Sequence, residues 1–103
     1  MDIPENLLRL LIKLATVDGE LIKDVKIDRT STVGLLKQVI RRETSGLAGW
    51  EDFEPQNQRL IFGGDVLGND AKVLSEIRNL ANDSVIMLTR RRNQDQGTDF
   101  IWI

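Results

Sequence analysis

The sequence contains no cysteine and no histidine in its 103 residues. Without cysteine the chain has neither disulfides nor thiolate zinc ligands. Without histidine it lacks the commonest general base and the commonest neutral metal ligand. The acidic residues are scattered over turns and helix ends, and no two share an apolar setting that would raise a carboxyl pKa for acid–base catalysis. We therefore expect no enzymatic activity, no metal and no cofactor.

Long hydrophobic runs are also missing. No run approaches the roughly 20 residues of a membrane span, and the first residues lack the basic segment and apolar stretch of a signal peptide. This predicts a protein of the cytoplasm or the nucleus that is not bound to membranes. The formal charge of −2 provides no overall attraction to nucleic acid. A hydrophobic content of 41% in a chain of this length is that of one folded domain.

Apolar periodicity predicts a β-hairpin followed by a helix. Residues 10–14 and 21–27 alternate between apolar and polar side chains, and residues 17–20 between them form a turn. Hydroxyl residues then precede a stretch with helical spacing. Its apolar face is formed by Val33, Leu36, Val39 and Ile40, and its solvent-exposed face is expected to carry Lys37, Gln38, Arg41 and Arg42.

The stretch QRLIFGGDVL, residues 58–67, allows two interpretations, because Gly63-Gly64 after an apolar run suits either a phosphate-binding loop or a tight turn. The phosphate loop requires a Lys and a Ser or Thr at the start of a following helix, and none is present. A β-turn between strands at 59–62 and 66–67 is therefore predicted. A helical turn containing Leu74, Ile77 and Leu80 follows, and then a last strand at 85–89 with Met87 and Thr89 facing outward.

Residues 44–55 form a loop that carries two aromatic side chains, Trp50 and Phe53. They are either a recognition pair borne by the loop or a small satellite core that pins the loop over the sheet. The satellite core is favoured, because two exposed aromatic residues beside Glu51 and Asp52 would gain little.

Together, the segments Gln58-Arg59-Leu60-Ile61-Phe62-Gly63-Gly64 and Leu74-Ser75-Glu76, with Leu67 and Leu80, make the chain resemble ubiquitin and its ubiquitin-like relatives. The first segment is similar to QQRLIFAGKQL of ubiquitin. The resemblance implies an α+β fold of the β-grasp type, a mixed sheet packed on one main helix. It predicts an N-terminal extension at 1–9, a ubiquitin-like domain at 10–92 and a flexible tail at 93–103.

The resemblance also implies a partner-binding face. The ubiquitin surface that most receptors recognise would fall on Val17, Ile61, Met87 and Thr89, and Arg59 on the third strand is predicted as a fifth partner-binding residue. Met87 replaces a His and Thr89 an apolar residue, so receptors tuned to ubiquitin itself are expected to bind more weakly. Asp65 stands where ubiquitin has the Lys that most often links one ubiquitin to the next in a chain. The longer loop at 45–54 is expected to add specificity of its own.

Conjugation of a ubiquitin-like modifier requires a tail that ends, after processing, in Gly-Gly, and Gly63-Gly64 is the one such pair in the sequence. We therefore expect a protein that is not attached to targets and binds a receptor or regulator of the ubiquitin system. The alternative is a ribonucleoprotein component that uses Arg90, Arg91 and Arg92, with Arg59 nearby, against RNA. Without stacking aromatic residues in the sheet, nucleic acid is disfavoured.

The tail carries a second candidate motif, Phe100, Ile101, Trp102 and Ile103 after Asp99. It resembles short peptides that add a strand to ubiquitin-like proteins of the autophagy and SUMO type. Alternatively, it folds back on its own domain or on a neighbour and covers Ile61 and Met87. A monomer is expected, with self-association through the tail as the other outcome.

Overall fold

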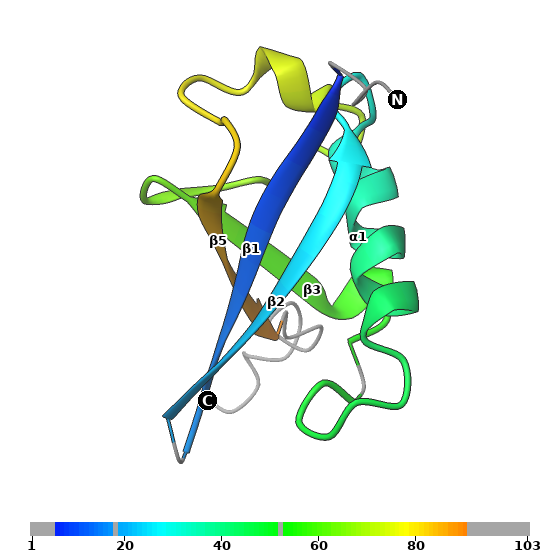
Figure 1. Cartoon of the computed structure of the whole chain (residues 1–103), viewed down its shortest axis with the longest axis vertical. Helices are drawn as coiled ribbons and strands as arrows, with labels where there is room; N and C mark the ends of the chain where they lie inside the picture. Colours follow the sequence, from blue (N-terminus) through cyan, green and yellow to red (C-terminus); the bar gives the residue numbers. More distant parts are fainter. Residues whose placement is uncertain (1–5, 18, 52, 91–103) are drawn as a thin grey trace, which may run out of the picture.

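In the computed structural model, residues 6–17, 19–51 and 53–90 are described. They form a five-stranded sheet in the order β2-β1-β5-β3-β4, with helix α1 across one face (Figure 1). Strands β1 and β5 are parallel and the other neighbours are antiparallel, so the sheet is mixed. The α+β architecture of the β-grasp type that the sequence predicts is confirmed.

The predicted hairpin is present and longer than expected. Strand β1, Leu7–Thr16, pairs along its whole length with β2, Gly19–Asp28. On β1 the inward side chains Leu8, Leu10, Ile12 and Leu14 are buried, as the alternation predicts. The strand begins at Leu7 rather than at residue 10, because Leu7 and Leu8 continue the same alternation and find partners on β2.

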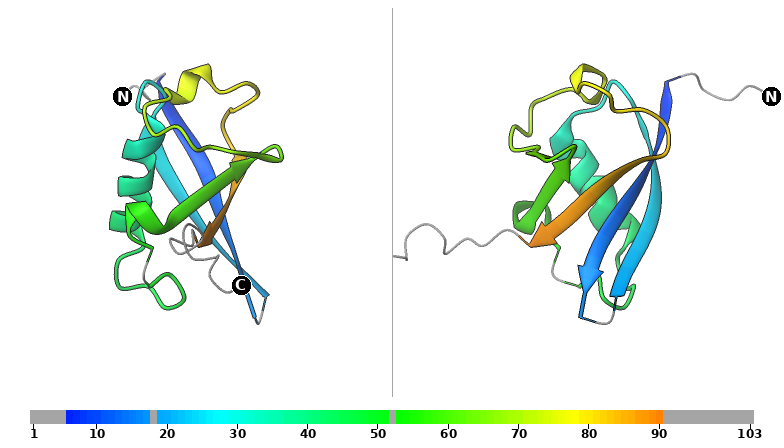
Figure 2. Two further views of the ribbon diagram at one scale, coloured as in Figure 1. Left: turned by 180° about the vertical axis from the view of Figure 1, so that it is seen from behind. Right: turned by 90° about the vertical axis from the view of Figure 1, so that its left-hand side faces the viewer.

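Helix α1, Val33–Glu43, lies on the inner face of the sheet (Figure 2). The hydroxyl of Thr32 caps it by accepting a hydrogen bond from the Leu35 amide at 3.2 Å. The predicted apolar face is buried. The placement of Lys37 on the solvent face was wrong, because its side chain is buried and its ammonium reaches Asp70 at 2.8 Å.

The Gly63-Gly64 pair turns the chain between β3, Gln58–Phe62, and β4, Asp65–Val66. Both glycines have positive φ, 62° and 88°, the left-handed region that a two-residue hairpin turn requires. The predicted β-turn is confirmed, and the short strand begins one residue earlier than expected.

The long loop is anchored from within. Trp50 and Phe53 are each only 4% exposed and join the main hydrophobic core. Their predicted structural role is confirmed, although they belong to the main core and not to a separate cluster. Gly49, at φ +91°, brings the loop so close to Leu21 that a Cβ there would lie 2.5 Å from its Cδ1. The 3₁₀ turn η1, Pro55–Asn57, then leads into β3.

The segment before the last strand is less helical than predicted. A 3₁₀ turn, η2, covers Leu74–Glu76 alone, and the chain then passes to β5, Ser84–Arg90. Leu74 is buried, and Ile77 and Leu80 pack against the core, so the predicted apolar contacts are made without the longer helical turn.

Candidate protein-interaction surface

The side of the sheet turned away from α1, hereafter the outer face, carries a continuous row of side chains across all five strands. The strand registers place Ile22 opposite Lys13, Lys13 opposite Met87, Met87 opposite Ile61, and Ile61 opposite Val66. Ile22 is 60% exposed, Met87 40% and Val66 48%. We call these five residues the outer row. Four of the five are apolar and lie in one row, whereas the exposed apolar residues of an ordinary surface are scattered singly.

Four of the five predicted partner-binding residues lie together on this face. Ile61 and Met87 are direct cross-strand partners in the outer row. One row further along the strands, Thr89 is paired with the exposed Arg59. Arg59 thus places a cation next to the apolar centre of the face.

Val17 does not join them. It lies at the tip of the β1–β2 hairpin, fully exposed, four residues beyond Lys13 along β1. At about 3.3 Å per residue this is roughly 13 Å from the outer row. The long hairpin therefore carries Val17 away from Ile61 and Met87.

Sequence reasoning missed three exposed apolar residues of this face: Ile22, Val66 and Val85. The alternation that identified the inward residues could also have identified these three, because each is adjacent in sequence to an inward residue and must therefore point outward. The row itself depends on strand register, which a single sequence does not contain.

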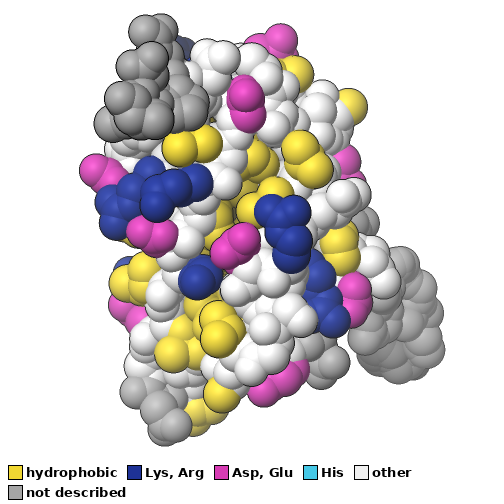
Figure 3. Space-filling view, turned by 45° about the vertical axis from the view of Figure 1, so that its right-hand side comes forward, with side chains coloured by type: hydrophobic (Ala, Val, Ile, Leu, Met, Phe, Trp, Pro, Cys, Tyr) yellow, Lys and Arg dark blue, Asp and Glu magenta, His cyan; other side chains and the backbone are white. Residues whose placement is uncertain are grey.

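Ion pairs flank the outer row on the β1–β2 side. Lys13 is 3.0 Å from Glu20, and Arg9 contacts both Asp24 and Asp83. The hydrogen bond that Arg9 donates to Asp24, followed by the one that it donates to Asp83, raises the pKa of Arg9 above its ordinary value, so it stays charged. Figure 3 shows the molecule turned toward the side of α1, where basic and acidic side chains are also interspersed. On the outer face Lys13 and Arg9 are each paired with acidic side chains, a charge pattern that does not suit a nucleic-acid surface.

The basic end of β5 is partly engaged within the domain. The guanidinium of Arg90 lies 4.9 Å from the centroid of the Phe53 ring, a cation–π contact. The predicted RNA-contacting residues Arg91 and Arg92 lie outside the described residues. The same holds for the tail motif Phe100, Ile101, Trp102 and Ile103.

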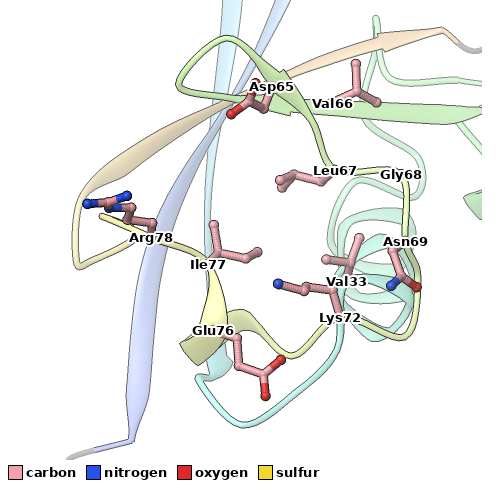
Figure 4. Close-up of a pocket in the computed structure, with 10 residues that line it drawn as sticks. All are labelled: Val33, Asp65, Val66, Leu67, Gly68, Asn69, Lys72, Glu76, Ile77 and Arg78. Atoms are coloured by element: carbon pink, nitrogen blue, oxygen red, sulfur yellow. The ribbon is translucent and has the colours of Figure 1, made fainter.

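A hollow of about 380 Å³ lies beside β4, lined by Val33, Leu67 and Ile77 among others (Figure 4). Within the described part of the chain, no three Asp or Glu side chains gather so as to hold a metal ion. A search of the same residues finds no helix long and apolar enough to cross a membrane.

The sequence matches a known protein family over most of its length. The model of the ubiquitin family matches residues 4–93. The chain belongs to the ubiquitin family. No curated protein matches it.

Two solved structures of the same fold illustrate how far the likeness extends. The ubiquitin-like domain of the Arabidopsis thaliana protein At2g32350 is 22% identical, with a TM-score of 0.64 over 84% of this chain and 80% of that one. The N-terminal ubiquitin-like domain of the 4931431F19Rik protein is 18% identical, with a TM-score of 0.65 over 89% of this chain and 82% of that one. At these identities the similarity shows the fold alone.

Proposed function

We propose that this ubiquitin-family chain is a non-catalytic interaction module that is not attached to targets. It binds a protein receptor or regulator of the ubiquitin system, in the cytoplasm or the nucleus, through the outer face. The observation that carries the proposal is the outer row, in which Ile61 and Met87 pair at the centre and the exposed Ile22 and Val66 lie on either side. Partially exposed apolar side chains at the centre of a face are the usual anchors of a protein interface.

The chemistry of the face indicates the kind of partner. A flat sheet with an apolar centre suits an amphipathic helix or a loop that lays its own apolar side chains across Ile61 and Met87. Arg59 beside this centre has no ion pair with any described residue and would pair with an Asp or Glu of the partner. Such rim charges speed association more than they strengthen it.

The test is a titration of the nitrogen-15 labelled chain with helical ubiquitin-binding domains, one at a time. We expect amide shifts at Ile61, Met87 and Thr89. Replacing Ile61 by Ala should weaken binding by about 1 to 3 kcal/mol, the range of an interface anchor, without loss of the fold, since Ile61 is only half-buried and lies outside the core.

The control is Leu35→Ala, which removes an exposed apolar side chain from α1 on the other side of the molecule. It should leave the affinity unchanged. Equal losses for both variants, or shifts away from the outer face, would contradict the proposal. Binding to single-stranded RNA that weakens steeply with added salt would instead assign the function to the basic end of β5.

A further inference from the structure

The hollow beside β4 is an open depression at the edge of the outer face, with an apolar centre and charged residues, among them Asp65, Lys72 and Glu76, around it. Figure 4 shows the side chains of Leu67 and Ile77 pointing into a common space, with Val33 at its base. Leu67 and Ile77 rest on the hydrophobic core with one side and line the hollow with the other. At about 380 Å³ the hollow is large enough to take an aromatic side chain. Val66, the last member of the outer row, stands at its rim.

One charged group points into this apolar space. The ammonium of Lys72 reaches toward Ile77, whereas the carboxylate of Glu76 points away (Figure 4). The side chain of Lys72 makes no ion pair or hydrogen bond with any described residue, and its hydrogen bonds there are made by its backbone. An ammonium beside apolar walls would gain most from a ligand that brings a carboxylate together with a large apolar side chain.

The sequence contains one segment with that chemistry and no assigned place, namely Asp99 followed by Phe100, Ile101, Trp102 and Ile103. We propose that this segment docks in cis in the hollow, with an aromatic ring against Leu67 and Ile77 and with Asp99 paired to Lys72. Each aromatic side chain so enclosed removes about 150–250 Å² of apolar surface from water. The proposal does not rest on the proposed function, because the hollow lies beside the outer face.

The length of the connection fits this placement. Three residues of β5 separate Arg90 from the level of Ile61, about 10 Å, and two strand spacings lead from β5 to β4, about another 10 Å. The hollow therefore lies roughly 15–20 Å from Arg90. Ten residues join Arg90 to Phe100, and a flexible chain of that length has a root-mean-square span of about 16–19 Å. A tether whose span matches the distance gives the highest effective concentration.

The test uses the full chain and its amide signals. Replacing both Phe100 and Trp102 by Ser should shift the signals of Leu67, Asn69 and Ile77, and leave the outer-face signals of Ile22 and Val85 in place. Both substitutions follow β5 in the sequence, and unchanged signals of Ile22 and Val85 would show that the fold is kept. Differences that persist on dilution support docking in cis.

Charge reversal tests the pair directly. Lys72→Glu and Asp99→Lys should each reduce the equilibrium constant for docking, by up to about fivefold, the range of an exposed ion pair. The two together should restore it. Lys26→Glu, on the opposite edge strand β2, is the matched control and should change nothing.

Three results would overturn the proposal. Unchanged signals around the hollow in the Ser variant would show that the segment docks elsewhere or not at all, and shifts confined to Ile22, Met87 and Val85 would place it on the outer face. Differences that vanish on dilution would assign the segment to a second copy of the chain.

Discussion

Lys37, Thr44 and Gln58 are the polar side chains that the described structure buries, and each has hydrogen-bond partners. Gln58 donates from Nε2 to the carbonyls of Lys37 and Phe53, at 2.9 and 3.0 Å, and so joins α1, the long loop and β3. Lys37 is paired across the domain with Asp70. A sequence pattern treats both residues as surface polar groups, because burial of a polar side chain depends on partners that are distant in the chain.

Removing the partner of Lys37 should destabilise the domain. We expect Asp70→Ala to lower the free energy of unfolding by about 1.5–3 kcal/mol, because a buried ammonium loses its charged hydrogen bond. Alanine keeps the Cβ of residue 70, which lies close to Gly34, so the packing at that point is unchanged. Denaturant unfolding monitored by circular dichroism measures the change, and Asp65→Ala, which removes an exposed carboxylate on β4, is the control.

A second background makes this test specific. In a Lys37→Met chain no ammonium is buried, so Asp70→Ala should cost markedly less. Equal costs in the two backgrounds would mean that Asp70 acts through its own loop and not through Lys37.

The sequence predicted a helix, hairpin or turn correctly wherever a single local pattern is enough to specify that element. Alternation identified the β1–β2 hairpin, hydroxyl capping and helical spacing identified α1, and Gly63-Gly64 identified the turn before β4. The η2 segment was less predictable, because apolar spacing alone does not separate a 3₁₀ turn from an α-helical one. The full length of the β1–β2 hairpin, which places Val17 away from the outer row, was missed for a related reason. Turn residues show that the chain reverses its direction, but they do not show how far the two strands remain paired.

A residue in the connection between β2 and α1 makes the stability of the domain depend on pH. Asp28, at the end of β2, accepts hydrogen bonds from the hydroxyl of Thr30 and then from its amide, and these lower the pKa of Asp28. The folded chain therefore protonates Asp28 less readily than the unfolded chain. Its contribution is complete above the unfolded pKa of about 3.9 and is lost as pH falls below that value, through the lower pKa of the folded state.

Asp28→Asn should accordingly destabilise the domain at neutral pH and much less in acid. The comparison is a series of denaturant unfolding curves for both chains between about pH 7 and pH 2. Asp65→Asn serves as the control, since the Asp65 side chain makes no hydrogen bond within the described residues. A difference between Asp28→Asn and the parent chain that stays constant with pH would rule out the titration of Asp28 as its source.

At the scale of the whole molecule, the sheet order sets where the domain is most stable. Strands β1 and β5 lie at the centre, paired on both sides, whereas β4 is a two-residue edge strand. Amides of β1 and β5 should exchange with solvent most slowly, at the rate of global unfolding, and those of β4 and of the hairpin tip fastest. Hydrogen exchange followed by NMR gives the order, and β4 amides as slow as those of β5 would contradict it.

The family fold could be predicted from the sequence because the segment at 58–64 and the order of elements are specific to it. The candidate surface was predicted only in part. Ile61, Met87, Thr89 and Arg59 share a face because β3 and β5 are neighbours, which the resemblance supplied. Ile22 and Val66 complete the row only through the registers of β2 and β4, and the hollow beside β4 depends on loop packing that no local pattern specifies.

The parallel pairing of β1 with β5 also affects how the protein is made. Leu10 and Ile12 of the first strand find their neighbours in Ser84 and Ile86 of the last. A ribosome therefore has to release nearly the whole domain before the centre of its sheet can close, and folding waits for long-range contacts. Until then the edge of β1 that β5 will occupy has no partner strand. An unpaired strand edge of this kind makes the incomplete chain prone to associate with other chains.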